Sequence, residues 1–84
     1  MESFLLNPLP TRIEDLERQI AVIDEEQKRC TAAIRDLMDR EDIGRGIVFP
    51  MEIHELHQRK NMLETHKQYR RVRINRLRLG RGAL

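Results

Sequence analysis

The chain of 84 residues is 36% charged and only 4% aromatic, with a formal net charge of +2. It can form one small domain at most, and its composition is typical of long helices packed along narrow stripes, which excludes a large globular core. One cysteine excludes an internal disulfide, and no apolar run approaches the roughly 20 residues of a membrane span, so we expect a cytoplasmic protein in a reducing environment.

Residues 1–10 are predicted to form a short N-terminal arm. Pro8 and Pro10 favour an extended backbone there, because proline fixes its own φ and restricts the residue before it. Phe4, Leu5 and Leu6 make the arm too apolar for a simple solvated tail. We therefore expect these side chains to pack against protein, either the ends of the same chain or a partner.

A long helix is predicted over residues 11–40. Thr11 followed by Glu14 has the spacing of a capping box, in which each side chain bonds the other residue's backbone N–H. Along this helix the core-type positions recur at alternating intervals of three and four, the heptad pattern of a helix packed along one stripe. These positions, of which Ile20 and Ile34 in particular are expected to be buried, are Ile13, Leu16, Ile20, Ile23, Gln27, Cys30, Ile34 and Leu37.

A turn is predicted over residues 41–49, followed by a second helix over residues 50–79. Gly44 and Gly46 permit the chain to reverse its direction. Pro50 suits the first turn of a new helix, where its missing N–H is not needed. Two long helices joined by a short connection are expected to fold back as an antiparallel hairpin.

Glycines are expected to end the second helix. Gly80 and Gly82 follow the last periodic residue, so residues 80–84 are predicted to be a tail and residues 11–79 the hairpin. Continuing the same spacing through the second helix gives a stripe that is apolar at both ends and mostly cationic in the middle. Its positions are Ile53, Leu56, Lys60, Leu63, Lys67, Arg70, Ile74 and Leu77.

The distribution of charge supports this antiparallel arrangement. Residues 1–58 carry a net charge of −6, whereas residues 59–84 carry +8. Folding near residue 45 places the acidic part of the first helix beside the basic end of the second. Gln27 then faces the cationic stretch, so the centre of the hairpin is predicted to be polar, with long side chains that keep their charged ends near water.

More apolar side chains are present than one two-helix contact can cover. Small chains rarely stabilise themselves on a single stripe, so part of this surface is expected to meet another chain. The predicted fold is all-α: a two-helix coiled-coil hairpin with a short arm, completing a four-helix bundle by dimerisation or by docking on a partner. The predicted partner-binding residues are Phe4, Leu5, Leu6, Ile47, Val48, Phe49, Met62 and Tyr69, with Phe49 as the main anchor of the turn.

The end of the second helix suggests an alternative partner. Residues 69–82 contain six arginines and no acidic residue, a composition that favours phosphate contact and nucleic-acid binding. Arg71, Arg78 and Arg81 are the predicted nucleic-acid residues. The remaining three arginines, Arg70, Arg73 and Arg76, are expected to pair with acids of the first helix.

No arrangement of residues indicates catalysis or a cofactor. His54 and His57 lie three apart on the second helix, but two ligands do not make a metal site, and Cys30 lies on the packed stripe. A hairpin has no pocket that excludes water, so no enzymatic activity, small-molecule substrate, metal or cofactor is expected. The sequence therefore predicts a non-enzymatic interaction protein, a small regulator, inhibitor or assembly subunit, with a protein partner or a second copy and without membrane contact.

Overall fold

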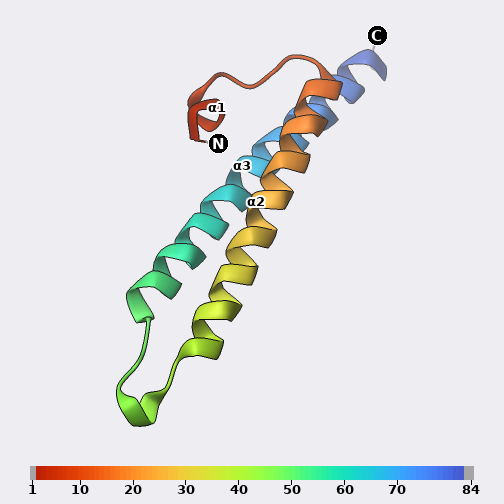
Figure 1. The fold of residues 1–84 in the computed structure, drawn as a ribbon. Helices are drawn as coiled ribbons and strands as arrows, with labels where there is room; N and C mark the ends of the chain where they lie inside the picture. The colour runs from red at the N-terminus through yellow and green to blue at the C-terminus, as the bar shows by residue number, and fades with distance from the viewer. Residues whose placement is uncertain (1, 83–84) are drawn as a thin grey trace.

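Two long antiparallel helices make up most of the molecule. The computed structural model describes residues 2–82, with side chains from residue 4 to residue 80. Helix α2 (Ile13–Arg40) and helix α3 (Pro50–Gly82) pack along each other (Figure 1), with the short helices α1 (Glu2–Leu6) and η1 (Ile43–Arg45) before and between them. The molecule is a rod of 65 × 22 × 15 Å. This arrangement confirms the predicted all-helical hairpin.

The helices meet along the predicted stripes. On α2 the buried side chains are Leu16, Ile23, Cys30 and Ile34, and on α3 they are Leu63, Lys67, Arg70 and Ile74. The other stripe positions on both helices are half-buried, because a two-helix contact is open to solvent along its two sides. The prediction is thus confirmed for Ile34, whereas Ile20 is only half-buried.

Helix α2 begins two residues later than predicted. Its N-cap is Arg12, whose carbonyl accepts the Leu16 N–H at 3.1 Å and whose side chain makes no capping bond. The expected capping box of Thr11 and Glu14 is therefore wrong. Thr11 lies in a bend outside the helix, and the exposed Glu14 carboxylate lies 3.8 Å from the Arg12 guanidinium instead.

The turn is a compact structure with its own hydrogen bonds. Asp42 and Ile47 bond each other in both directions, at 2.8 and 2.9 Å between backbone N and O, and enclose η1. Gly46 has φ 73°, in the left-handed region that favours glycine. The next helix follows directly, because the Phe49 N–H donates to the Glu41 carboxylate at 2.9 Å and the Phe49 carbonyl accepts from Ile53. These bonds define the geometry of the tip.

The expected tail over residues 80–84 is wrong for its first three residues. Helix α3 continues through Gly80 to Gly82, the last described residue. Gly80 does not take a positive φ, and nothing lies within 4 Å of the place where a Cβ would stand, so neither its backbone nor its surroundings require a glycine that ends the helix. Glycine costs a helix only about 1 kcal/mol relative to alanine, which the flanking helix formers tolerate.

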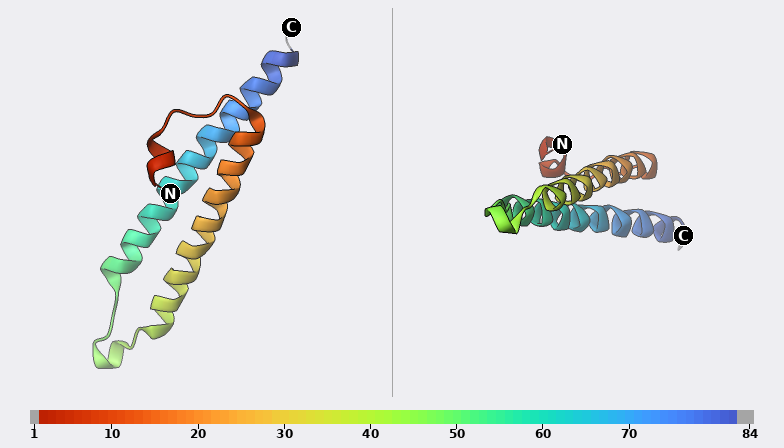
Figure 2. Two further views of the ribbon diagram at one scale, coloured as in Figure 1. Left: turned by 45° about the horizontal axis from the view of Figure 1, so that its top comes forward. Right: turned by 60° about the horizontal axis from the view of Figure 1, so that its bottom comes forward.

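The arm folds back onto the hairpin. Residues 2–6 form α1, where an extended backbone was predicted, and an extended segment of residues 7–10 leads from it toward α2. Figure 2 shows α1 against one face of the paired helices, well away from the turn. Leu5 is buried in a cluster with Ile23, Cys30 and Leu63, and the half-buried Phe4 packs against this cluster. The arm therefore covers the middle of the hairpin rather than one of its ends.

Candidate interaction surfaces

A network of polar side chains joins the two helices at mid-length, and we call it the polar centre. The Lys67 ammonium donates to Asp24 and to the Gln27 amide oxygen, each at 2.7 Å, and lies 3.3 Å from Glu64. The Gln27 amide nitrogen donates to Glu64 at 3.1 Å, and Gln68 donates to the other Glu64 oxygen at 2.6 Å. The buried lysine is thus surrounded by acceptors, and the predicted polar centre is confirmed.

The polar centre should make stability depend on pH. Hydrogen bonds from Gln68, then Gln27 and Lys67, lower the pKa of Glu64 from 4.5 to about 2. A lowered carboxyl pKa contributes stability above pH 4.5 that is lost as the pH falls toward 2. Because Glu64 is half exposed, we expect a shallow decrease in the free energy of unfolding over this range. Urea denaturation at a series of pH values measures it.

A matched pair of variants isolates this effect. Glu64→Gln should remove the decrease in the free energy of unfolding at acid pH, which we call the acid limb. Glu55→Gln, at an exposed glutamate of α3, should leave the acid limb unchanged. At high pH the free energy of unfolding should instead fall as the pH rises. The hydrogen bond to Asp24 raises the pKa of Lys67 above 10.5, so the stabilisation by the charged lysine is present below that pH and is lost as the pH rises further. Equal acid limbs in wild type and Glu64→Gln would contradict the prediction.

Several exposed hydrophobic side chains lie in and beside the turn. Ile43 is 85% exposed at the end of the turn, and four further apolar side chains around it are exposed as well. Phe49 is half-buried, with the Arg40 guanidinium 5.3 Å above its ring. We define the apolar tip as Met38, Ile43, Ile47, Val48 and Met51.

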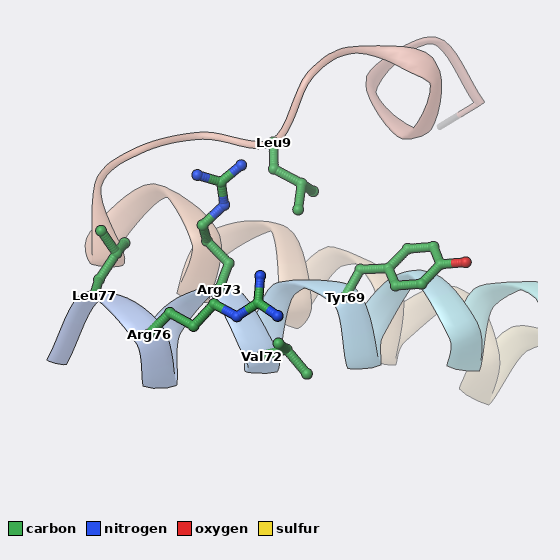
Figure 3. A pocket seen from close by; sticks show the side chains of 6 residues that line it. All are labelled: Leu9, Tyr69, Val72, Arg73, Arg76 and Leu77. Carbon is green, nitrogen blue, oxygen red and sulfur yellow. The ribbon is translucent and has the colours of Figure 1, made fainter. Parts of the chain in front are cut away.

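A second candidate surface lies at the other end of α3, where a hollow of about 500 Å³ opens between the arm and the helix. Figure 3 shows its lining: Leu9 reaches down from the arm, while the other side chains come from successive turns of α3. Arg73 and Arg76 have no ion pair among the described residues. We call this the outer groove; it is lined by Leu9, Tyr69, Val72, Arg73, Arg76 and Leu77.

The arginines do not divide as predicted. Arg78, expected to be available to nucleic acid, lies 3.3 Å from Glu17. Arg71 is exposed and has no ion pair among the described residues, and the side chain of Arg81 lies outside them. The expected pairing of Arg70, Arg73 and Arg76 with acids of α2 is wrong for all three within the described part of the chain.

Arg70 is buried instead, with an exposure of 0%. Its Nε donates to the Gln19 amide oxygen at 2.8 Å and its Nη1 donates to the His66 carbonyl at 2.9 Å. Its Nη2 has no hydrogen-bond partner. The Phe4 ring covers the guanidinium at 5.3 Å, and burial lowers the pKa of Arg70. An arginine in the contact between two helices thus lacks a carboxylate.

No family model, curated protein or solved structure matches the chain. The surfaces described above therefore carry the functional interpretation by themselves.

The predicted partner-binding residues fall into three places. Leu5 and Phe4 contact the chain's own hairpin, whereas Leu6 is 86% exposed beside Met62 and His66. Tyr69 is exposed and meets the His66 ring edge to face at 5.7 Å. Ile47, Val48 and Phe49 belong to the turn.

Sequence reasoning missed one feature of these surfaces. The outer groove was not predicted, because it depends on Leu9 meeting α3 after the arm folds back. Among the described residues no helix is apolar enough to cross a membrane and no cluster of three or more metal-ligating side chains occurs.

Proposed function

We propose that this protein is a non-enzymatic interaction module, a small regulator, inhibitor or assembly subunit, that docks its apolar tip on a partner protein. The observation that carries the proposal is that the backbone of the turn is held by hydrogen bonds while its apolar side chains are exposed. Hydrogen bonds through Asp42, Glu41 and Ile47 hold the turn, yet Ile43 remains almost fully exposed. A pre-formed apolar end loses little conformational entropy on binding, which favours association.

The charges around the tip favour a protein partner. Residues 38–52 carry four acidic and two basic side chains, so this end would be repelled by anionic lipid and by phosphate. A second copy of the chain is the simplest such partner, and two hairpins would complete the four-helix bundle that the surplus apolar surface favours. Met62 and Tyr69 on the exposed side of α3 would then add to the contact.

Substitutions at the tip test the proposal. The pair Ile43→Asp and Val48→Asp should abolish association without loss of helicity, because both side chains are exposed in the free chain. Size-exclusion chromatography with light scattering, at micromolar to millimolar concentration, should show a dimer for wild type and a monomer for the double variant. Val22→Asp, at a position of α2 that is as exposed as Val48, is the control away from the tip and should remain dimeric. A wild-type mass equal to the monomer at every concentration would contradict self-association.

Nucleic-acid binding is the second candidate, and one observation favours it. Arg71, Arg73 and Arg76 have no ion pairs among the described residues, and Tyr69 lines the outer groove with Arg73 and Arg76 as a surface on which a base could stack. In this set Arg73 and Arg76 take the place of Arg78, which is engaged by Glu17, and Arg81 stays a prediction because its side chain lies outside the described residues.

A salt series tests this candidate. The affinity for duplex DNA or structured RNA should fall steeply with salt, with log K decreasing by about 0.9 per phosphate contacted for each unit of log salt. Replacing all three arginines by glutamine should reduce that slope, whereas Arg35→Gln, at an exposed arginine of α2, should not. Absence of binding at low salt would eliminate nucleic acid as the partner.

A further inference from the structure

The orphan guanidinium nitrogen of Arg70 is the strongest unexplained feature of the fold. Arg70 is completely buried, and its Nη2 finds no acceptor, although Nε and Nη1 are both bonded. A buried donor without a partner costs free energy, and a buried charge without a counter-charge costs more. The packing of α2 against α3 does not by itself require an arginine at this position, because an apolar side chain could fill the same space at a lower cost in free energy.

Helix α1 is the cover over this arginine. The Phe4 ring lies 5.3 Å from the Arg70 guanidinium carbon, and Leu5 fills a slot formed by Ile23, Cys30 and Leu63. Five residues are far too few for a helix that is stable alone, so α1 depends on this docking. The segment of residues 7–10 that follows is extended and exposed or half-exposed, so it can lift away without disturbing α2.

We propose that the site beneath α1 is a docking site for a short helix of a partner protein that carries two neighbouring apolar residues and one carboxylate. The arm occupies it within the same chain, with Phe4 and Leu5 as the two apolar residues. It supplies no described carboxylate to Nη2. A partner helix with the same apolar pair and an Asp or Glu completes the hydrogen bonding of Arg70, because carboxylates accept strongly from guanidinium N–H groups.

The chemistry of the site selects a protein helix over a nucleic acid. The slot beneath Leu5 is lined by Ile23, Cys30 and Leu63, which are buried apolar side chains that a sugar–phosphate backbone cannot fill. Among the described residues of this site, Arg70 is the cation that lacks a counter-charge, since the neighbouring Lys67 is already bonded to Asp24. This site lies along the middle of the rod, apart from the apolar tip, so the proposal is tested independently of docking at the tip.

The test uses the arm itself as the probe. A fluorescent peptide with the sequence of residues 1–10 and Glu2→Gln, which removes its carboxylate side chain, is the parent peptide. It is titrated against the full-length chain carrying Phe4→Ser and Leu5→Ser, which frees the site and leaves the sequences of α2 and α3 unchanged. Two acidic peptides, with Ser3→Asp or Asn7→Asp, place a carboxylate one residue before or one turn after Phe4. We expect the parent peptide to bind and one acidic peptide to bind at least about tenfold tighter, the effect of one charge-assisted hydrogen bond.

Arg70 must be the source of that gain. In the same chain with Arg70→Met added, the parent peptide should still bind and the acidic peptides should show no advantage. Equal affinity of all three peptides for the chain that retains Arg70 would overturn the carboxylate assignment. Absence of binding by every peptide, or displacement of the bound peptide by an RNA oligonucleotide, would overturn the docking site.

A second measurement keeps the proposal testable if the Phe4→Ser, Leu5→Ser chain does not fold. Cys30 is the only cysteine and lies buried beneath Leu5, so its alkylation in the wild-type protein reports opening of the arm. An acidic peptide in excess should slow this alkylation by holding the site closed, and should do so more than the parent peptide. Unchanged alkylation at saturating peptide would overturn the proposal.

Discussion

Ile23→Asp should unfold the hairpin. Ile23 has an exposure of 0% and joins Leu5, Cys30 and Leu63 in the core cluster. The substitution removes apolar packing, which costs about 2–5 kcal/mol for a large aliphatic side chain. It also buries a carboxylate without a partner, which adds several kcal/mol more. A chain of this size has only a few kcal/mol of stability to lose.

The neighbouring residue provides the control. Val22 precedes Ile23 on α2 and is 47% exposed, so Val22→Asp introduces the same carboxylate at an exposed position. Circular dichroism at 222 nm should show loss of most helicity for Ile23→Asp and a cooperative melting curve close to wild type for Val22→Asp. Equal melting temperatures for the two variants would mean that the stripe is not the contact between α2 and α3.

Arg70→Met should make the protein more stable. Methionine has a similar length, fills the same space and can contact the Phe4 ring through its sulfur. It removes a buried charge that lacks a carboxylate and an Nη2 that lacks an acceptor. Replacing buried ion pairs by apolar side chains is often stabilising by about 1–4 kcal/mol, and here no ion pair is lost. For a chain of this length, 1 kcal/mol corresponds to about 4–8 °C in melting temperature.

The adjacent arginine is the matched control for this prediction. Arg71 is exposed and has no ion pair among the described residues, so Arg71→Met should leave the melting temperature nearly unchanged. A lower melting temperature for Arg70→Met would show that the bonds to Gln19 and the His66 carbonyl outweigh the cost of burying the charge. A gain in stability would mean that arginine is held at this position at a cost, as expected for a residue that serves binding.

The packing of α2 against α3 was predictable from the sequence because it rests on periodicity. Every predicted stripe position is buried or half-buried, including the polar ones, since a heptad places each residue on a known side of the helix. The same antiparallel register predicted that Gln27 faces the cationic stretch of α3, where it bonds Lys67. The opposite net charges of the two halves of the chain supported this register.

The start of α2, the end of α3 and the arm were not predictable in the same way. Thr11 and Gly80 are residue types that are common at helix ends, but a residue caps a helix only when its backbone takes the capping conformation. Here the N-cap is Arg12, and Gly80 lacks the positive φ of a C-terminal cap. The docking of α1 depends on Leu5 finding a slot between residues from two helices, for which no local pattern exists. The missing carboxylate at Arg70 is likewise a result of tertiary packing.

The polar centre also prevents the two helices from sliding past each other. A shift of α3 by one heptad moves each residue by about 10 Å along α2. In one direction the shift would bring Ile74 to Asp24, and in the other it would carry Lys67 into the apolar position of Ile74. Either slip breaks ionic bonds and buries a charge against hydrocarbon. The register of the two helices is therefore fixed along the 65 Å rod, and we expect the turn and the arginine-rich end to keep a constant separation.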